Sequence, residues 1–202
     1  MARIKTKSDR AALTRRANVA KSSRASLPLT VSRPELLTDG TDRDFRRLVH
    51  NIFAFMARHD AVRDGHAQQI GLAGVEYTIL ISIGHLGLDG DVNIKTVADH
   101  LHMSGAFITT VTRKLQSIGL VEKIQDHVDR RRITLVITEK GKALLRRLAP
   151  DQREINDVEF GSLTREQFRL LSEILENLID CGNKAVALQQ YKLTIKDIGK
   201  VA

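Results

Sequence analysis

The chain has 202 residues, of which 42% are hydrophobic, and this is enough to build one globular domain of ordinary size. No run of about 18 or more apolar residues occurs, so the sequence predicts no membrane-spanning helix. The single cysteine, Cys181, excludes an intramolecular disulfide and suits a reducing cytoplasm.

The formal net charge of +8 is concentrated at the N-terminus. Residues 1–26 contain eight basic side chains and one acid, whereas the remainder holds 24 basic and 23 acidic residues. Residues 1–38 are expected to form a basic, disordered tail and an extended lead-in, because Pro28 and Pro34 oppose helix formation. Two roles remain open for the tail, a solubilising segment and an arm that touches DNA phosphates.

Two helices are predicted before residue 90. Asp39, Gly40 and Thr41 favour the start of the first, at about 41–68. Its apolar residues recur at helical spacing and are expected to share one face: Phe45, Leu48, Val49, Ile52, Phe53 and Met56. A second helix is predicted over 73–86, and the sequence GLDGD ends it.

Two shorter helices follow, one from about Val92 to Leu101 and one from Ser104 to Ile118. Ser104 is a good N-cap and Gly119 a good stop signal. One face of the later helix is apolar, with Ile108, Val111, Leu115 and Ile118. The opposite face is small, polar or basic, with Ala106, Thr109, Thr110, Arg113, Gln116 and Ser117.

A hairpin is predicted next, with strands at 120–125 and 133–137 joined by DHVDRRR. Strand alternation directs Ile133, Leu135 and Ile137 inward on the face that also carries Asp129 and Arg131, whereas Arg130 and Arg132 point the other way. The charges at the tip suit the minor groove of DNA, and they equally suit a hairpin edge protected from aggregation.

Two helices complete the chain. Thr138 caps a helix that is expected to continue through Leu148. Thr164 and Gln167 match a capping box, which predicts a last helix over about 164–190. Its apolar stripe contains Leu171, Ile174, Leu175, Leu178 and Ile179.

Helix, short turn, helix and hairpin is the order of a winged helix-turn-helix, in which the second helix faces the major groove. The stretch VADHLHMSGAFITTVTRKLQSIGLVEK, followed by DRRRITLVITEKG, resembles the MarR family of bacterial transcription regulators over roughly 75–148. The resemblance implies a mainly α fold with a small β-hairpin wing. It implies a single domain over 39–202, with the winged helix-turn-helix at about 73–148 between dimerisation helices at about 41–68 and 164–190.

The resemblance also implies a function. We expect a cytoplasmic homodimer that binds a pseudo-palindromic operator in double-stranded DNA and acts as a repressor, released by a small ligand such as an aromatic acid. Arg131, held by Asp129, would enter the minor groove with Arg130 and Arg132 beside it. The base and phosphate contacts expected from the second helix are Ser104, Ala106, Thr109, Thr110 and Arg113.

The sequence departs from the family in the second helix. An arginine common near Thr110 is missing, and Phe107 replaces a residue that is more often small and polar. Phe107 either packs against the protein, the interpretation favoured here, or contacts a thymine methyl group. For the effector, candidate lining residues are Arg46, Phe53, Phe55 and His59, although phenylalanines such as Phe53 and Phe55 are more often core residues than the wall of a ligand pocket.

Other classes of function have little support. No phosphate-binding loop, nucleophile motif or catalytic triad occurs, so no enzyme and no cofactor are predicted. The spacing of Asp89, Asp91 and Asn93 fails as a calcium loop at Ile94, and a zinc site built on His59 and His66 is not favoured. The main alternative is an architectural protein that binds DNA without sequence preference through its tail and wing. An interaction module that has lost DNA binding is the third.

Overall fold

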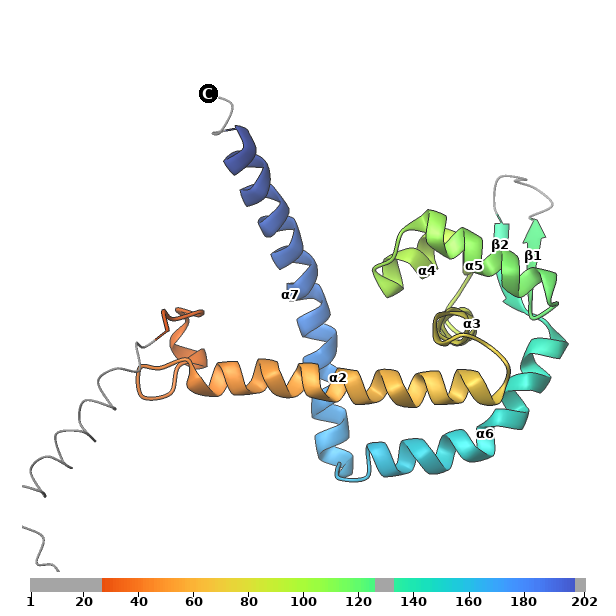
Figure 1. Cartoon of the computed structure of the whole chain (residues 1–202), viewed down its shortest axis with the longest axis horizontal. Coiled ribbons are helices and arrows are strands. Elements are labelled where there is room, and N and C mark those ends of the chain that lie inside the picture. Colours follow the sequence, from red (N-terminus) through yellow and green to blue (C-terminus); the bar gives the residue numbers. More distant parts are fainter. Residues whose placement is uncertain (1–26, 126–132, 199–202) are drawn as a thin grey trace, which may run out of the picture. The chain divides into compact units, whose positions relative to one another are not determined.

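The structure, a computed structural model, describes residues 27–125 and 133–198. It confirms a mainly helical fold with a two-stranded antiparallel wing (Figure 1). None of the described helices is long and apolar enough to cross a membrane. The elements in chain order are the 3-10 helix η1 (Pro34–Leu36), α2 (Arg43–Gln69), α3 (Gly74–Leu86), α4 (Ile94–Leu101), α5 (Gly105–Ser117), β1 (Val121–Gln125), β2 (Ile133–Ile137), α6 (Glu139–Glu159) and α7 (Arg165–Ile198).

The chain divides into two compact units, the first ending at His59 and the second beginning at Asp60, within α2. In the first unit the buried carboxylate of Asp42 binds residues of the segment that precedes α2 and of α2 itself. Its Oδ2 accepts hydrogen bonds from the backbone N of Thr30 at 2.8 Å and from the Thr30 hydroxyl at 2.7 Å. The same oxygen pairs with Arg46 Nη2 at 2.9 Å.

Two predictions for this region need correction. The lead-in is not extended throughout, because Pro34 opens the one-turn helix η1, and a proline at the first helical position has a suitable fixed φ. The next helix begins at Arg43 rather than near Thr41. Thr38 and Thr41 instead pair as an isolated β-bridge around two residues of positive φ, Asp39 and Gly40.

The apolar face predicted for α2 is not covered by the described residues of the first unit, 27–59. Four of its six residues are exposed there: Leu48, Ile52, Phe53 and Met56. An amphipathic helix is stabilised mainly by burying such a face.

The core of the second unit lies where α3, α4, α5 and the hairpin meet. The helix α3 is seen end-on in Figure 1, and it contacts both α5 and β2. Ile79 and Leu80 of α3, Val97 of α4 and Leu115 of α5 are all fully buried. The helix α5 packs against this core with one of its faces.

The hairpin pairs Val121 with Ile137 at its base and Gln125 with Ile133 at its outer end. The backbone N of Leu135 also donates to the carbonyl of Val92 at 2.7 Å, which joins the segment before α4 to β2. Of the three residues predicted to point inward, Leu135 is buried and Ile137 is half-buried. The prediction for Ile133 is wrong, since it is 44% exposed at the outer end of the strand, beyond the core.

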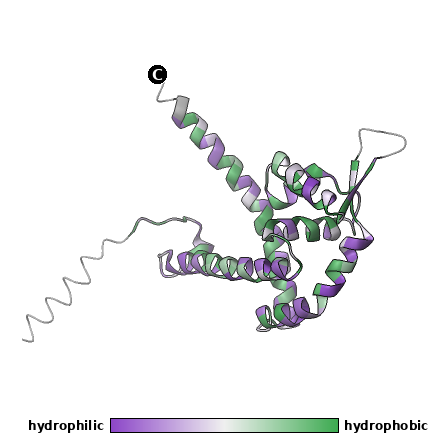
Figure 2. Ribbon diagram, turned by 45° about the vertical axis from the view of Figure 1, so that its right-hand side comes forward, coloured by the Kyte–Doolittle hydropathy of each residue, from purple (hydrophilic) through white to green (hydrophobic). Residues whose placement is uncertain are grey.

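Both C-terminal helices are longer than predicted. The helix α6 continues to Glu159 with Pro150 inside it, and α7 continues to Ile198. The predicted capping box is confirmed, because the Thr164 amide donates to Gln167 Oε1 at 2.9 Å and the Gln167 amide donates to Thr164 Oγ1 at 3.2 Å. Hydrophobic and hydrophilic segments alternate along α7 in Figure 2. Its apolar residues are exposed, among them Leu171, Ile174, Leu175, Leu178 and Ile179.

Candidate nucleic-acid interface

The helix α5 is built as a rigid element with one face anchored in the core. Its N-cap is confirmed, since Ser104 Oγ accepts a hydrogen bond from the Phe107 amide at 3.2 Å. Ile108, Val111 and Leu115 are buried as predicted. Ile118 was expected to join them but is 37% exposed, because α5 ends at Ser117 and the chain turns at Gly119 with φ +75°.

The opposite face of α5 is open to solvent. Ser104, Ala106, Thr110 and Arg113 are exposed, and Thr109 is half-buried. The Thr109 hydroxyl donates to the Gly105 carbonyl at 2.7 Å, and the Thr110 hydroxyl donates to the Ala106 carbonyl at 3.1 Å. The five residues predicted to contact DNA therefore come together on and beside one accessible surface.

Phe107 is 43% exposed, so its ring packs against the protein only in part. It lies in the first turn of α5, and the buried side of the following turn is filled by Ile108 and Val111. The second interpretation, a contact with DNA, stays open.

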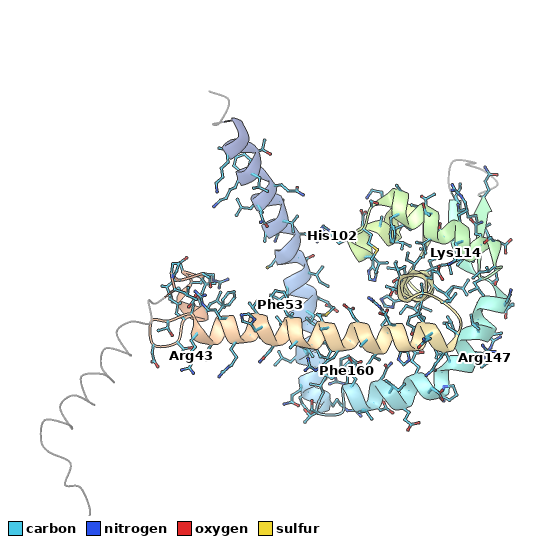
Figure 3. All side chains as sticks on the ribbon, in the orientation of Figure 1. Arg43, Phe53, His102, Lys114, Arg147 and Phe160 are labelled. Carbon is cyan, nitrogen blue, oxygen red and sulfur yellow. The ribbon has the colours of Figure 1, made fainter. Side chains whose placement is uncertain are left out.

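Long-range contacts hold the C-terminal end of α5. Lys114, labelled in Figure 3, lies in the last turns of α5 and forms an ion pair with the buried carboxylate of Glu76 in α3. Burial raises the pKa of Glu76, but the hydrogen bonds from Lys114 and from the Ala73 amide more than offset this, and its pKa lies below the ordinary 4.5. Beyond the C-terminus, Lys140 Nζ donates to the Ile118 carbonyl at 2.6 Å.

The start of α6 is tied to the same region. The Thr138 hydroxyl donates to the Gly119 carbonyl at 2.7 Å and accepts from the Gly141 amide at 3.1 Å. Sequence reasoning identified Thr138 as a cap. It did not identify Lys114 or Lys140 as supports of α5, because their partners are distant in sequence.

The tip of the wing lies outside the described residues, and with it lie the predicted contacts Asp129, Arg130, Arg131 and Arg132. Beside the described strands, a hollow of about 330 Å³ opens between the hairpin and the N-terminus of α4. Lys95 and Lys123 line it. Lys95 Nζ pairs with Asp99 Oδ2 at 2.5 Å.

The four candidate effector residues all lie in the first unit, on α2. Arg46 donates to the Pro28 carbonyl at 2.6 Å besides pairing with Asp42, so its guanidinium already has partners. The rings of Phe55 and His59 are stacked with centroids 6.0 Å apart. Phe53 is 64% exposed and Phe55 is 41% exposed, so neither is a core residue within the chain itself.

His66, considered for a zinc site, is buried in the second unit. Its Nε2 lies 3.4 Å from Asn156 Oδ1 of α6, and its ring meets that of Tyr77 edge-on at 6.1 Å. Tyr77 in turn accepts a hydrogen bond from Gln152 at 2.9 Å. Over residues 27–125 and 133–198, no group of three or more His, Cys, Asp or Glu side chains is placed to hold a metal ion.

Comparison with known proteins gives a consistent result. The MarR family pattern matches residues 75–133, which contain α3 to the start of β2. The repressor NicR of Pseudomonas putida is 27% identical over 149 residues, which are 73% of this chain and 92% of NicR.

Solved structures share the fold. A mutant MarR from E. coli complexed with operator DNA has a TM-score of 0.54 at 16% identity, covering 67% of this chain and 95% of that one. BpsR of Bordetella bronchiseptica, whose DNA binding is regulated by 6-hydroxynicotinic acid, has a TM-score of 0.52 at 21% identity, covering 65% of this chain and 91% of that one. Together with α5 and the hairpin, the family pattern identifies residues 75–133 as the winged helix-turn-helix of the MarR family of non-enzymatic, DNA-binding transcription regulators, and the solved structures share its fold.

Proposed function

We propose that this protein acts in the cytoplasm as a homodimeric repressor that binds a pseudo-palindromic operator and leaves it when a small aromatic acid binds. The observation that carries the proposal is the accessible face of α5, on which Ala106, Thr110 and Arg113 are exposed while the other face is fixed in the core. A rigid helix of this kind suits the major groove.

The homodimer is supported by the apolar surface of the long helices. Each of the two helices exposes apolar side chains at helical spacing, among them Leu48, Ile52 and Met56 of α2 and Leu171, Leu175 and Leu178 of α7. Clustered exposed apolar residues of this kind are typical of a protein interaction site rather than of a solvated face. A second copy of the chain supplies the same two helices, and a two-fold axis would pair the winged units with a palindrome.

Specific residues have proposed roles at the DNA. Ala106, Thr109, Thr110 and Arg113 contact base edges, and Ser104 places the first amides of α5 toward a phosphate. At the wing, Arg131 enters the minor groove with Asp129 holding it. Arg130 and Arg132 contact the backbone.

The effector is the least constrained part of the proposal. Its support is the regulation of BpsR by 6-hydroxynicotinic acid and the repressor function named for NicR. Arg46, Phe53, Phe55 and His59 offer a cation and aromatic surface on α2, and a bound carboxylate would have to compete with Asp42 for Arg46. Such a ligand releases DNA only if it binds the DNA-free conformation more tightly.

Fluorescence anisotropy tests the proposal. The full-length protein is titrated onto its own upstream DNA, onto a shuffled duplex and onto duplexes selected from a random pool, at several salt concentrations. A preference of about a thousandfold or more for particular sequences at physiological salt is expected. Binding that is equal for all duplexes and collapses with salt would instead support the architectural alternative.

Release is tested with the same assay. Aromatic carboxylates, including 6-hydroxynicotinic acid, are expected to weaken operator binding and to raise the melting temperature of the free protein. If neither quantity changes for any of them, this class of effector is wrong. Analytical ultracentrifugation of the wild type and of Leu178→Asp, on the exposed face of α7, tests the dimer.

A further inference from the structure

The first two turns of α5 expose apolar groups where a DNA-reading helix often exposes donors. Ala106 and Thr110 are exposed and lie one turn apart, and Phe107 is 43% exposed between them. Phe107 lies at the edge of the buried stripe of α5, where Ile108 and Val111 are buried beside it and the ring itself stays partly exposed.

Thr110 presents its methyl group rather than its hydroxyl proton. The proton is directed to the backbone, because Thr110 Oγ1 donates to the Ala106 carbonyl at 3.1 Å. A base acceptor would have to displace this bond. What the surface offers is therefore the Ala106 methyl, the Phe107 ring and the Thr110 methyl. These are the three kinds of side-chain group that contact the 5-methyl of thymine in the major groove.

The two cations of α5, Arg113 and Lys114, lie outside these first two turns. Lys114 is held by Glu76, and Arg113, the exposed cation suited to guanine, lies one turn further along the helix. The helix rises about 6 Å from Ala106 to Thr110, at about 1.5 Å per residue. This rise spans about two base steps of roughly 3.4 Å.

From this geometry we infer that the first two turns of α5 read the methyl groups of two adjacent thymines in each operator half-site, with Phe107 as a specificity-determining residue. The inference rests on the proposed function, since it assumes that α5 enters the major groove. The inference adds to the proposed function a preference for adjacent thymines and a role for Phe107, neither of which the resemblance to the family supplies.

Deoxyuridine substitution tests the methyl contacts directly, because uracil differs from thymine only by the 5-methyl group. The half-site is first defined by selection from random duplexes with the full-length protein. Each thymine is then replaced in turn. At two adjacent positions we expect affinity to fall about fourfold per methyl group, the equivalent of one methyl group no longer buried. Replacement outside the half-site should have no effect.

Protein variants assign the contact to Phe107. Phe107→Ala should weaken binding to the thymine operator and should abolish the uracil effect at one of the two positions. Ile118→Ala is the matched control, since it removes an apolar side chain of similar exposure, 37%, at the residue that follows the C-terminus of α5. It should retain the full uracil effect, and melting temperatures verify that both variants fold.

The outcomes are distinct. Specific binding without any uracil effect would overturn the inference and leave the proposed function in place. An unchanged uracil effect in Phe107→Ala would overturn the role of Phe107. Binding without sequence preference would overturn the inference and the proposed function together.

Discussion

Glu76, in the first turn of α3, and Lys114, in the last turns of α5, form an ion pair whose two members differ in exposure. The Glu76 side chain is 8% exposed and that of Lys114 is 61% exposed. The same carboxylate accepts a hydrogen bond from the Ala73 amide at 3.1 Å, which closes the first turn of α3. One buried carboxylate therefore stabilises α3 and sets α5 against it.

Glu76→Ala should lower the free energy of unfolding by about 1–3 kcal/mol, because hydrogen bonds to a charged group disappear and the Ala73 amide is left without its acceptor. Lys114→Met should cost less, about 0–1 kcal/mol, because its ammonium is largely solvated. Urea denaturation measures both values. Equal losses in the two variants would contradict the assignment of the carboxylate as the dominant partner.

Acid should weaken the wild type more than Glu76→Gln. The pKa of Glu76 is lowered from 4.5 in the folded protein, so its carboxylate stabilises the fold at pH values above 4.5. This contribution is lost as the pH falls below that value toward the folded pKa. Denaturation followed between neutral pH and acid should show a shallower loss of stability in Glu76→Gln over that window, and parallel curves would refute the prediction.

Gly141→Ala should destabilise the junction between the wing and α6. An added Cβ would lie 2.5 Å from the Leu120 carbonyl oxygen and 2.6 Å from Ile137 Cγ2, so the backbone would have to shift. We expect a loss of about 1–3 kcal/mol in thermal or urea unfolding. Gly65→Ala, in α2, is the control. A Cβ there meets nothing within 4 Å, and the variant should be neutral or more stable.

Arg131→Ala should weaken binding to the selected operator by about 5- to 150-fold, since a good base contact is worth about 1–3 kcal/mol. Sedimentation of the dimer should not change. Arg153→Ala, an exposed arginine of α6, removes the same charge and should have a much smaller effect. Operator affinity is read by anisotropy, and an unchanged affinity for Arg131→Ala would remove the wing from the proposed interface.

Deletion of residues 2–26 should reduce the salt dependence of DNA binding if the tail is an arm. For every phosphate that the tail neutralises, its deletion should make the slope of log affinity against log salt shallower by about 0.9. Sequence preference should be retained, because the arm carries only charge contacts. An identical slope and affinity in the deletion would favour the solubilising role.

Elements that depend on neighbouring residues were predictable from the sequence. The periodicity of Ile108, Val111 and Leu115 and the cap at Ser104 are local properties of one helix, and both hold in the structure. The capping box at Thr164 is local in the same way. The order of helices and strands was therefore readable in advance, together with the polar face of α5.

Contacts between distant residues emerged only in the folded chain. The pairing of Glu76 with Lys114, the bond from Leu135 to the Val92 carbonyl and the exposure of Ile133 depend on where separate elements come together. Periodicity predicts the face of a residue but not how far the neighbouring layer extends, so Ile133 was assigned to a core that does not reach it. Short-range backbone preferences thus specify the winged helix-turn-helix and the polar face of α5. The support and exposure of that face follow from packing between segments far apart in the sequence.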